Sequence, residues 1–150
     1  MNPSAVSVGE SQASVRPKSR LRYLTAVLRI LPGLFLLLMG LNGFLNFLPQ
    51  PKVEMSEGAM AFSTALMKTG YMMQLIAATQ LIVGLFLVLN RFVPLALALF
   101  APFIVNSMAF HICLEHTGLP MASVFLAIEL YLAWVYRDSY RSMLRAKVTP

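Results

Sequence analysis

Two ionisable residues lie within apolar stretches of the sequence, where a charge is costly. Glu129 is close to the midpoint of the apolar residues 119–136, and His111 lies near the end of the apolar stretch before it. A carboxyl group in hydrocarbon must either pair or stay protonated, and a neutral imidazole beside it can accept and return its proton. We therefore predict that Glu129 and His111 are catalytic residues that handle protons together. In the alternative interpretation, Glu129 hydrogen-bonds to amide side chains and stabilises helix packing, while His111 anchors the chain at the membrane interface.

Five uncharged polar residues lie in similar apolar surroundings. If the chain crosses a membrane as successive helices, they fall into one layer with His111 and Glu129, in the middle and outer part of the membrane. Polar groups inside a bilayer usually face the interior of a helix bundle. We therefore expect one shared pocket that opens toward the extracytoplasmic side. The expected binding residues are Asn42, Asn46, Gln80, Asn106 and Ser107.

The spacing of the polar residues late in the third apolar stretch suggests a common helix face. Ser107, His111 and Glu115 follow one another at intervals of four, which places them on one ridge of a helix. His111 and Glu115 could share a metal ion, but His116 would point elsewhere, and the spacing differs from that of zinc-binding helices. We therefore predict no metal site. The single cysteine, Cys113, cannot form an internal disulfide.

The composition shows which elements must position these residues. The chain has 150 residues, of which 58% are hydrophobic and 12% charged, whereas soluble domains have about 45–50% apolar and about 25% charged residues. Three long uncharged stretches, Arg29 to Lys52, Lys68 to Arg91 and Arg91 to Glu115, each exceed the roughly 20 residues that a helix needs to cross a bilayer. A fourth apolar stretch, residues 119–136, carries only Glu129 as a charge. We therefore predict an all-α fold with four transmembrane helices, at about 24–48, 71–89, 93–115 and 119–136. Short connections make neighbouring helices of this bundle antiparallel.

Small residues indicate where two of these helices pack. Gly33, Gly40 and Gly43 lie in the first helix, and Ala77 and Gly84 lie on either side of Gln80 in the second. Small side chains allow helix backbones to approach closely in membranes. We therefore expect each of these two helices to allow a neighbouring helix to pack tightly against it.

The segments outside the membrane domain (23–136) are polar or amphipathic. Residues 1–22 and 137–150 are predicted to be basic cytoplasmic tails, the first of them disordered. Between the first two spans, Met55, Ala59, Phe62 and Leu66 share one helical face behind the capping residue Ser56. This pattern predicts a short interfacial helix in the outer loop. Such a helix either packs on the bundle with no role of its own or covers a site as a lid.

The basic residues predict the orientation. Of the 12 Lys and Arg residues, all except Lys52 and Lys68 fall on one side of the membrane if the chain crosses it four times. Basic loops stay cytoplasmic, so we expect both termini inside, in a bacterial-type cytoplasmic (inner) membrane that the chain crosses several times. The net charge of +6 then reflects topology and contact with the lipid bilayer, and we predict no nucleic-acid partner.

Several of these residues also carry a family resemblance. Over roughly residues 24–136 the chain resembles the DoxX family and DoxX-like four-helix membrane proteins. The family takes its name from a subunit of a membrane thiosulfate:quinone oxidoreductase, so the resemblance implies a redox-linked membrane subunit. The resemblance rests on Arg29, Gly33, Gly40, Asn42 and Gly43 in the first helix, Gln80 and Gly84 in the second, and His111 late in the third.

The sequence also departs from that family pattern. Many members have a lysine shortly after the glycine of the first helix, where this chain has Gly43. Many also have an acid four residues before the glycine of the second helix, where this chain has Gln80. An ion pair between these positions is therefore absent, and Glu129 is our candidate for the buried acid.

Three functions agree with these patterns. The first is a redox-associated subunit, with or without catalysis of its own, that binds a quinone or similar amphipathic molecule in the polar pocket. The second is a non-enzymatic membrane assembly or scaffold protein, and the third is a small-solute carrier. Redox partner proteins and a homo-oligomer are the partners that these functions imply.

Overall fold

The computed structural model describes residues 18–49 and 54–140, which form helices with short connections. No strand occurs in these two ranges, so the predicted all-α class is confirmed for them. The elements in chain order are α1 (Lys18–Leu45), α2 (Glu57–Lys68), α3 (Met72–Leu89), α4 (Val93–Cys113), the 3-10 turn η1 (His116–Gly118), α5 (Leu119–Val135) and α6 (Arg137–Tyr140).

Four helices are long and apolar enough to cross a membrane, as the sequence predicted. They are α1, α3, α4, and α5 together with η1. Their outward faces carry large apolar side chains, such as Leu31, Val105 and Leu130, which are all at least 60% exposed. An apolar surface of this extent suits lipid and not water.

The ends of α1 differ from those expected. The helix begins at Lys18, so residues 18–22, expected in a disordered tail, are helical. Arg and Leu are good helix formers and favour this extension. The helix ends at Leu45, not at residue 48, because Asn46 adopts a left-handed backbone conformation with φ of 49°.

The other boundaries move by a few residues. Helix α4, the third of the predicted membrane helices, ends at Cys113 and not at residue 115. Residues Arg137–Tyr140, expected in the second tail, form the short helix α6. The rest of the two predicted tails, residues 1–17 and 141–150, lies outside the described residues.

Helices α1 and α3 pack on each other through glycines, so each is the close neighbour that the small residues of the other accommodate. A Cβ atom at Gly84 would lie 2.7 Å from the carbonyl oxygen of Gly33, and one at Gly40 would lie 2.8 Å from that of Ala77. The two backbones are therefore so close that a methyl group at either position would overlap a main-chain atom. In these pairs, residues of α1 meet residues of α3 in reverse order.

A compact apolar core joins all four membrane helices. Leu36 of α1, Val83 and Leu87 of α3, and Leu132 of α5 are each at most 3% exposed. The remaining buried residues of this core belong to α4, which lies between its neighbours: Val93, Ala96, Leu97, Phe100 and Ile104.

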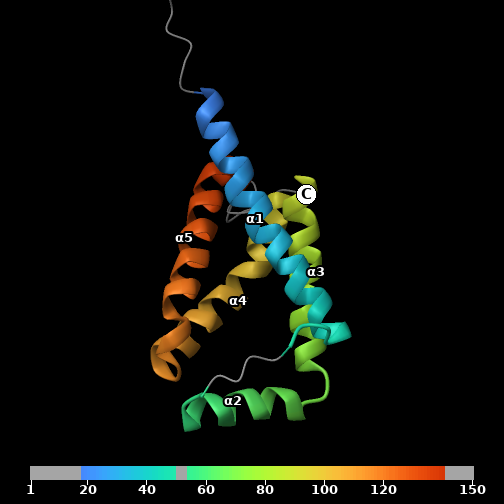
Figure 1. Ribbon diagram of the computed structural model, residues 1–150. Coiled ribbons are helices and arrows are strands. Elements are labelled where there is room, and N and C mark those ends of the chain that lie inside the picture. The colour runs from blue at the N-terminus through green and yellow to red at the C-terminus, as the bar shows by residue number, and fades with distance from the viewer. Residues whose placement is uncertain (1–17, 50–53, 141–150) are drawn as a thin grey trace, which may run out of the picture.

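Figure 1 shows the placement of the two ends of the bundle. The beginning of α1 and the end of α5 lie at the same end, together with the turn between α3 and α4. Helix α2 crosses the opposite end. Ala59 of α2 is fully buried, and Phe62 and Leu66 are partly buried, so the predicted inward face of this helix is confirmed at these positions. Met55 precedes the helix and is exposed.

Candidate ligand-binding site

The predicted polar residues do not share one pocket but line three adjoining pockets beneath and beside α2. Gln80, Ser107 and His111 line the first, which we call the aromatic pocket. Asn42, Asn46 and Gln80 line the second, the amide pocket. Asn106 lines the third, the α2 pocket. The expectation of a single shared pocket is thus wrong, because bulky side chains such as Phe35 and Phe103 stand between neighbouring pockets.

The aromatic pocket has a volume of about 270 Å³ and lies between α1, α3, α4 and α5. Four phenylalanines contribute aromatic rings to its wall. Phe35 and Phe125 face each other with ring centroids 5.3 Å apart, and Phe100 and Phe103 stack at 5.2 Å. The pocket therefore offers flat aromatic surfaces together with three hydrogen-bonding side chains, Gln80, Ser107 and His111.

A hydrogen bond indicates which ring nitrogen of His111 carries the hydrogen. Its Nδ1 atom lies 2.8 Å from the backbone carbonyl oxygen of Glu115. A carbonyl oxygen can only accept, so Nδ1 carries the hydrogen and donates it. In the neutral imidazole Nε2 is then an acceptor. His111 therefore offers an acceptor to a ligand in the aromatic pocket, while Ser107 and Gln80 can donate.

Gly118 sets the position of the His111 ring. A Cβ atom at residue 118 would overlap Cε1 of His111 and lie 2.6 Å from both ring nitrogens. The imidazole therefore packs directly on the backbone of η1. Gly118 also lines the aromatic pocket, and we treat it as a positioning residue because its backbone contacts the His111 ring.

The structure uses Asn42 and Asn46 to end α1. The Oδ1 atom of Asn42 accepts a hydrogen bond from the backbone N–H of Leu48 at 2.7 Å. The backbone N–H of Asn46 donates to the carbonyl oxygen of Asn42 at 2.8 Å. Both residues line the amide pocket of about 850 Å³, but the Asn42 side-chain carbonyl group already has a partner. Asn46 lies beyond the end of α1, so it does not share a helix face with Asn42.

Glu129 and His111 do not form the expected pair. His111 packs on Gly118 at the start of α5, whereas Glu129 lies eleven residues further along the chain, a distance of about 16 Å along a helix. Phe125 is the last α5 residue that lines the aromatic pocket, and Glu129 lies one helical turn beyond it. Glu129 is 9% exposed. Both residues lie on the inward side of the bundle. They do not pair because they lie at different depths.

The charge of Glu129 affects Tyr140, at the end of the bundle opposite α2. The Tyr140 hydroxyl, which donates to the carbonyl oxygen of Pro94 at 2.9 Å, has a raised pKa because it is partly buried and, secondarily, because of the charge of Glu129. Glu129 has no hydrogen-bond partner within residues 18–49 and 54–140. The alternative interpretation, in which Glu129 hydrogen-bonds to amide side chains, therefore also finds no support in this part of the chain.

Glu115 does not continue the ridge of Ser107 and His111, because α4 ends two residues before it. Glu115 has an extended backbone with φ of −146°, and its carboxylate accepts hydrogen bonds from the N–H of Ser56 at 2.9 Å and from the Thr117 hydroxyl at 3.0 Å. Hydrogen bonds from Ser56 and Thr117 lower the pKa of Glu115, the Ser56 bond most. The carboxylate thereby joins the start of α2 to the turn before α5.

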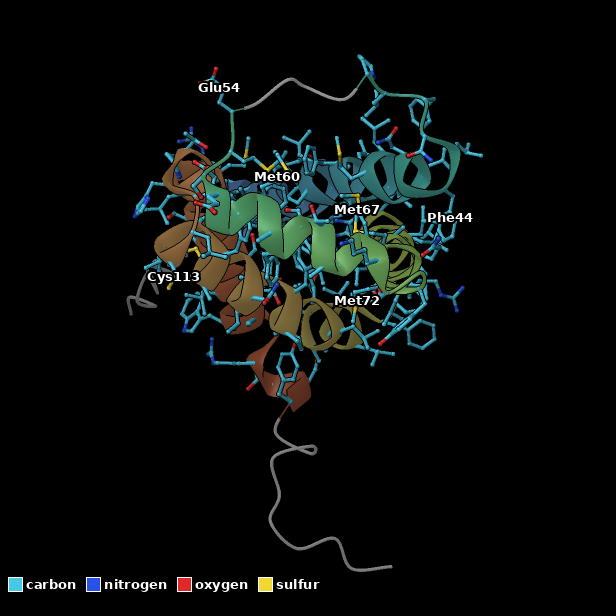
Figure 2. All side chains as sticks on the ribbon, turned by 90° about the horizontal axis from the view of Figure 1, so that it is seen from below. Phe44, Glu54, Met60, Met67, Met72 and Cys113 are labelled. Carbon is cyan, nitrogen blue, oxygen red and sulfur yellow. The ribbon has the colours of Figure 1, made fainter. Side chains whose placement is uncertain are left out.

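Helix α2 lies across one end of the bundle, as Figure 2 shows from below. Cys113 lies near its first residues, and Phe44 and Met72 lie near its last. Phe62 of α2 packs on Phe110 of α4, with ring centroids 5.4 Å apart. The helix is therefore held at its start by the hydrogen bonds of Ser56 and along its inner face by Phe62.

The aromatic residues of the pocket are functional candidates that the polar residues alone do not predict. A signal for them exists in the sequence, because Phe100, Ile104, Ser107 and His111 recur at helical spacing on α4. Extending the predicted ridge from Ser107 toward its start leads directly to Phe100. Phe35 and Phe125 give no such signal, since many apolar residues surround them.

Comparison with known proteins gives no match: no family model, no curated protein and no solved structure is similar to the chain. The class of protein therefore rests on the four apolar helices with lipid-type surfaces. They define a multi-pass helical membrane protein. Within this chain, the aromatic pocket with Gln80, Ser107 and His111 is the candidate ligand-binding site.

Proposed function

We propose that the protein is a DoxX-like, redox-associated membrane subunit that binds a quinone or a similar flat amphipathic molecule in the aromatic pocket. One observation carries this proposal. Three hydrogen-bonding side chains, Gln80, Ser107 and His111, line a pocket whose other lining residues are apolar and include four phenylalanines. Ligand pockets typically combine an apolar wall with a few placed polar groups.

The hydrogen-bonding groups suit both redox forms of such a ligand. A quinone presents carbonyl oxygens, which can accept from the hydroxyl of Ser107 and the amide of Gln80. A hydroquinone presents hydroxyl groups, which can donate to Nε2 of neutral His111. The phenylalanine rings can stack on the flat ligand ring.

The volume limits which part of the ligand enters. At about 270 Å³, the pocket is slightly smaller than the usual 300–1,000 Å³ of ligand sites. It has room for a head group of one or two rings. A long isoprenoid tail would extend into the surrounding lipid.

For the orientation we propose an antiparallel bundle with both termini in the cytoplasm of a bacterial-type cell. Helix α2 and the aromatic pocket then lie toward the extracytoplasmic side. The support is charge: Lys68 is the described basic side chain at the α2 end, whereas the opposite end carries Arg20, Arg22, Arg29, Arg91 and Arg137. Redox partner proteins and self-association belong to this proposal as consequences of the family resemblance.

Titration of the purified protein with menadione, a two-ring quinone without a long tail, tests the proposed function. We expect saturable binding by calorimetry, weakened about tenfold by Ser107→Ala or His111→Ala, because each removes a ligand hydrogen bond. Thr79→Val is the matched control, since Thr79 lines only the α2 pocket and donates to the carbonyl oxygen of Leu75. Absence of saturable binding, or equal weakening by the control, contradicts the proposal and favours a scaffold role.

A further inference from the structure

A fourth pocket, remote from the candidate site, opens at the end of the bundle opposite α2. It lies between α1, the turn from α3 to α4, and the end of α5, and its volume is about 480 Å³. We call it the arginine pocket. Its polar lining residues are Arg22, Thr25, Arg29, Asn90 and Tyr136.

Arg29 is the central feature of the arginine pocket because it is charged yet only 7% exposed. Buried arginines are normally paired with an acid. Arg29 has no such partner among the described residues. Its Nη1 atom donates to the carbonyl oxygen of Leu87, in the last turn of α3. Within residues 18–49 and 54–140, this is the single hydrogen bond of a side chain that carries five N–H donors.

The unused donors of Arg29 are not sealed inside the protein. Within the described part of the chain, no fully buried side-chain nitrogen or oxygen lacks a hydrogen-bond partner. The remaining donors of Arg29 are therefore accessible, and the arginine pocket is a space that this side chain lines.

The neighbours of Arg29 add further positive charge and donors. Arg22 lies seven residues earlier in α1, on the same face of the helix, and lines the same pocket. The Oδ1 atom of Asn90 accepts from the Tyr136 hydroxyl at 3.4 Å, so the amide nitrogen of Asn90 is left to donate. None of the described residues that line this pocket carries a carboxylate.

We propose that the arginine pocket binds a phosphate group, held by the guanidinium of Arg29 and by the charge of Arg22. A planar guanidinium with free N–H groups matches the geometry of phosphate oxygens. Basic pockets between membrane helices are typical binding sites for lipid head groups. A phospholipid and a free phosphate present this same chemistry, so the experiment must distinguish the two sources.

The experiment uses the purified full-length protein in detergent and three ligands. Dihexanoyl phosphatidylglycerol carries the phosphodiester, dihexanoyl glycerol lacks it, and inorganic phosphate supplies the anion alone. Arg22→Gln and Arg29→Lys change the pocket, the second keeping the charge but losing the planar donor pair. Arg20→Gln is the matched control, because it removes the same charge from α1 at a residue outside the pocket. Circular dichroism and gel filtration establish that each variant is folded.

We expect saturable 1:1 binding of phosphatidylglycerol, weakened about tenfold in Arg22→Gln and Arg29→Lys and less than about twofold in Arg20→Gln. Dihexanoyl glycerol should not bind. Binding of inorganic phosphate with the same variant pattern supports the phosphate site with a soluble anion as its source. The proposal is overturned if neither phosphate ligand binds saturably, if dihexanoyl glycerol binds equally well, or if Arg20→Gln has the effect of Arg22→Gln. Arg22 is exposed, so its variant remains informative even if Arg29→Lys does not fold.

Discussion

The carboxylate of Glu115 accepts a hydrogen bond from the backbone N–H of Ser56 at 2.9 Å, across 59 positions of the chain. The Ser56 hydroxyl in turn donates to the carbonyl oxygen of Leu114. These two contacts attach the residue that caps α2 to the turn that carries Gly118 and contacts His111. The position of α2 and the geometry of the candidate site are therefore linked through this turn.

The attachment of α2 should depend on pH. The pKa of Glu115 is lowered from 4.5 in the folded chain, so its stabilising effect is fully present above pH 4.5 and is lost as the pH falls through the lowered value. We expect Glu115→Gln to speed hydrogen exchange in α2 relative to the wild type at pH 7, with the difference vanishing in acid. Comparison at equal pH removes the intrinsic pH effect on exchange. Glu54→Gln, an exposed neighbour of Ser56, should leave exchange unchanged, and an equal effect of both changes would contradict the role of Glu115.

Gly118→Ala should weaken menadione binding about tenfold, equal to about 1.4 kcal/mol, without unfolding the protein. The added methyl group would overlap the His111 ring, 2.6 Å from both of its nitrogens, and would displace Nε2 from the aromatic pocket. Calorimetry measures the affinity, and the imidazole resonances of His111 report the displacement. An altered affinity with unchanged His111 resonances would show that Gly118 does not act through His111.

Gly40→Ala should reduce the free energy of unfolding by about 1–3 kcal/mol, as overpacking of a dense interface does. The new Cβ would lie 2.8 Å from the Ala77 carbonyl oxygen and 2.9 Å from the Leu81 nitrogen, and main-chain atoms cannot move aside easily. Gly58→Ala is the control, because its nearest atom is a terminal methyl group of Leu114 at 3.1 Å. Denaturant unfolding in detergent measures both variants, and an equal cost would argue against the importance of the α1–α3 contact.

Glu129→Leu should stabilise the protein by about 1–3 kcal/mol, since an apolar side chain of similar size removes the cost of a buried carboxyl group. The residue is 9% exposed and has no hydrogen-bond partner among the described residues. Thermal unfolding in detergent measures the change, with Glu129→Gln as the variant that keeps a polar group. A destabilised Glu129→Leu would mean that the carboxyl group has a partner when the protein lies in the membrane.

The single cysteine can test the proposed orientation. Cys113 is exposed and lies at the α2 end, so a membrane-impermeant maleimide should label it in intact cells if that end faces outward. In a Cys113→Ser background, Arg91→Cys at the opposite end should react only after lysis. The reverse pattern would place both termini outside.

The membrane helices and the small residues that allow close helix packing could be predicted because length, apolarity and residue size act locally. The pairing of α1 with α3 could not be predicted in this way, since it depends on the tertiary arrangement. The candidate site could be predicted only in part. Depth alone placed Gln80, Ser107 and His111 in one layer, and they do line one pocket. The separation of Glu129 from His111 depends on how far α5 extends alongside α4. The 3-10 turn after Cys113 determines this overlap, and no local sequence pattern reveals it. Likewise, the long-range bond from Glu115 to Ser56 requires α2 to fold back across the bundle.

The glycine contact between α1 and α3 also bears on biosynthesis. These helices leave the ribosome before α4 and α5, and their contact needs no residue from α4 or α5. Because chains fold from the N-terminus during synthesis, this hairpin can close while the second half is still being made. The wall of the aromatic pocket that contains Phe35 and Gln80 would then form first, and α4, which carries His111, would pack against it afterwards.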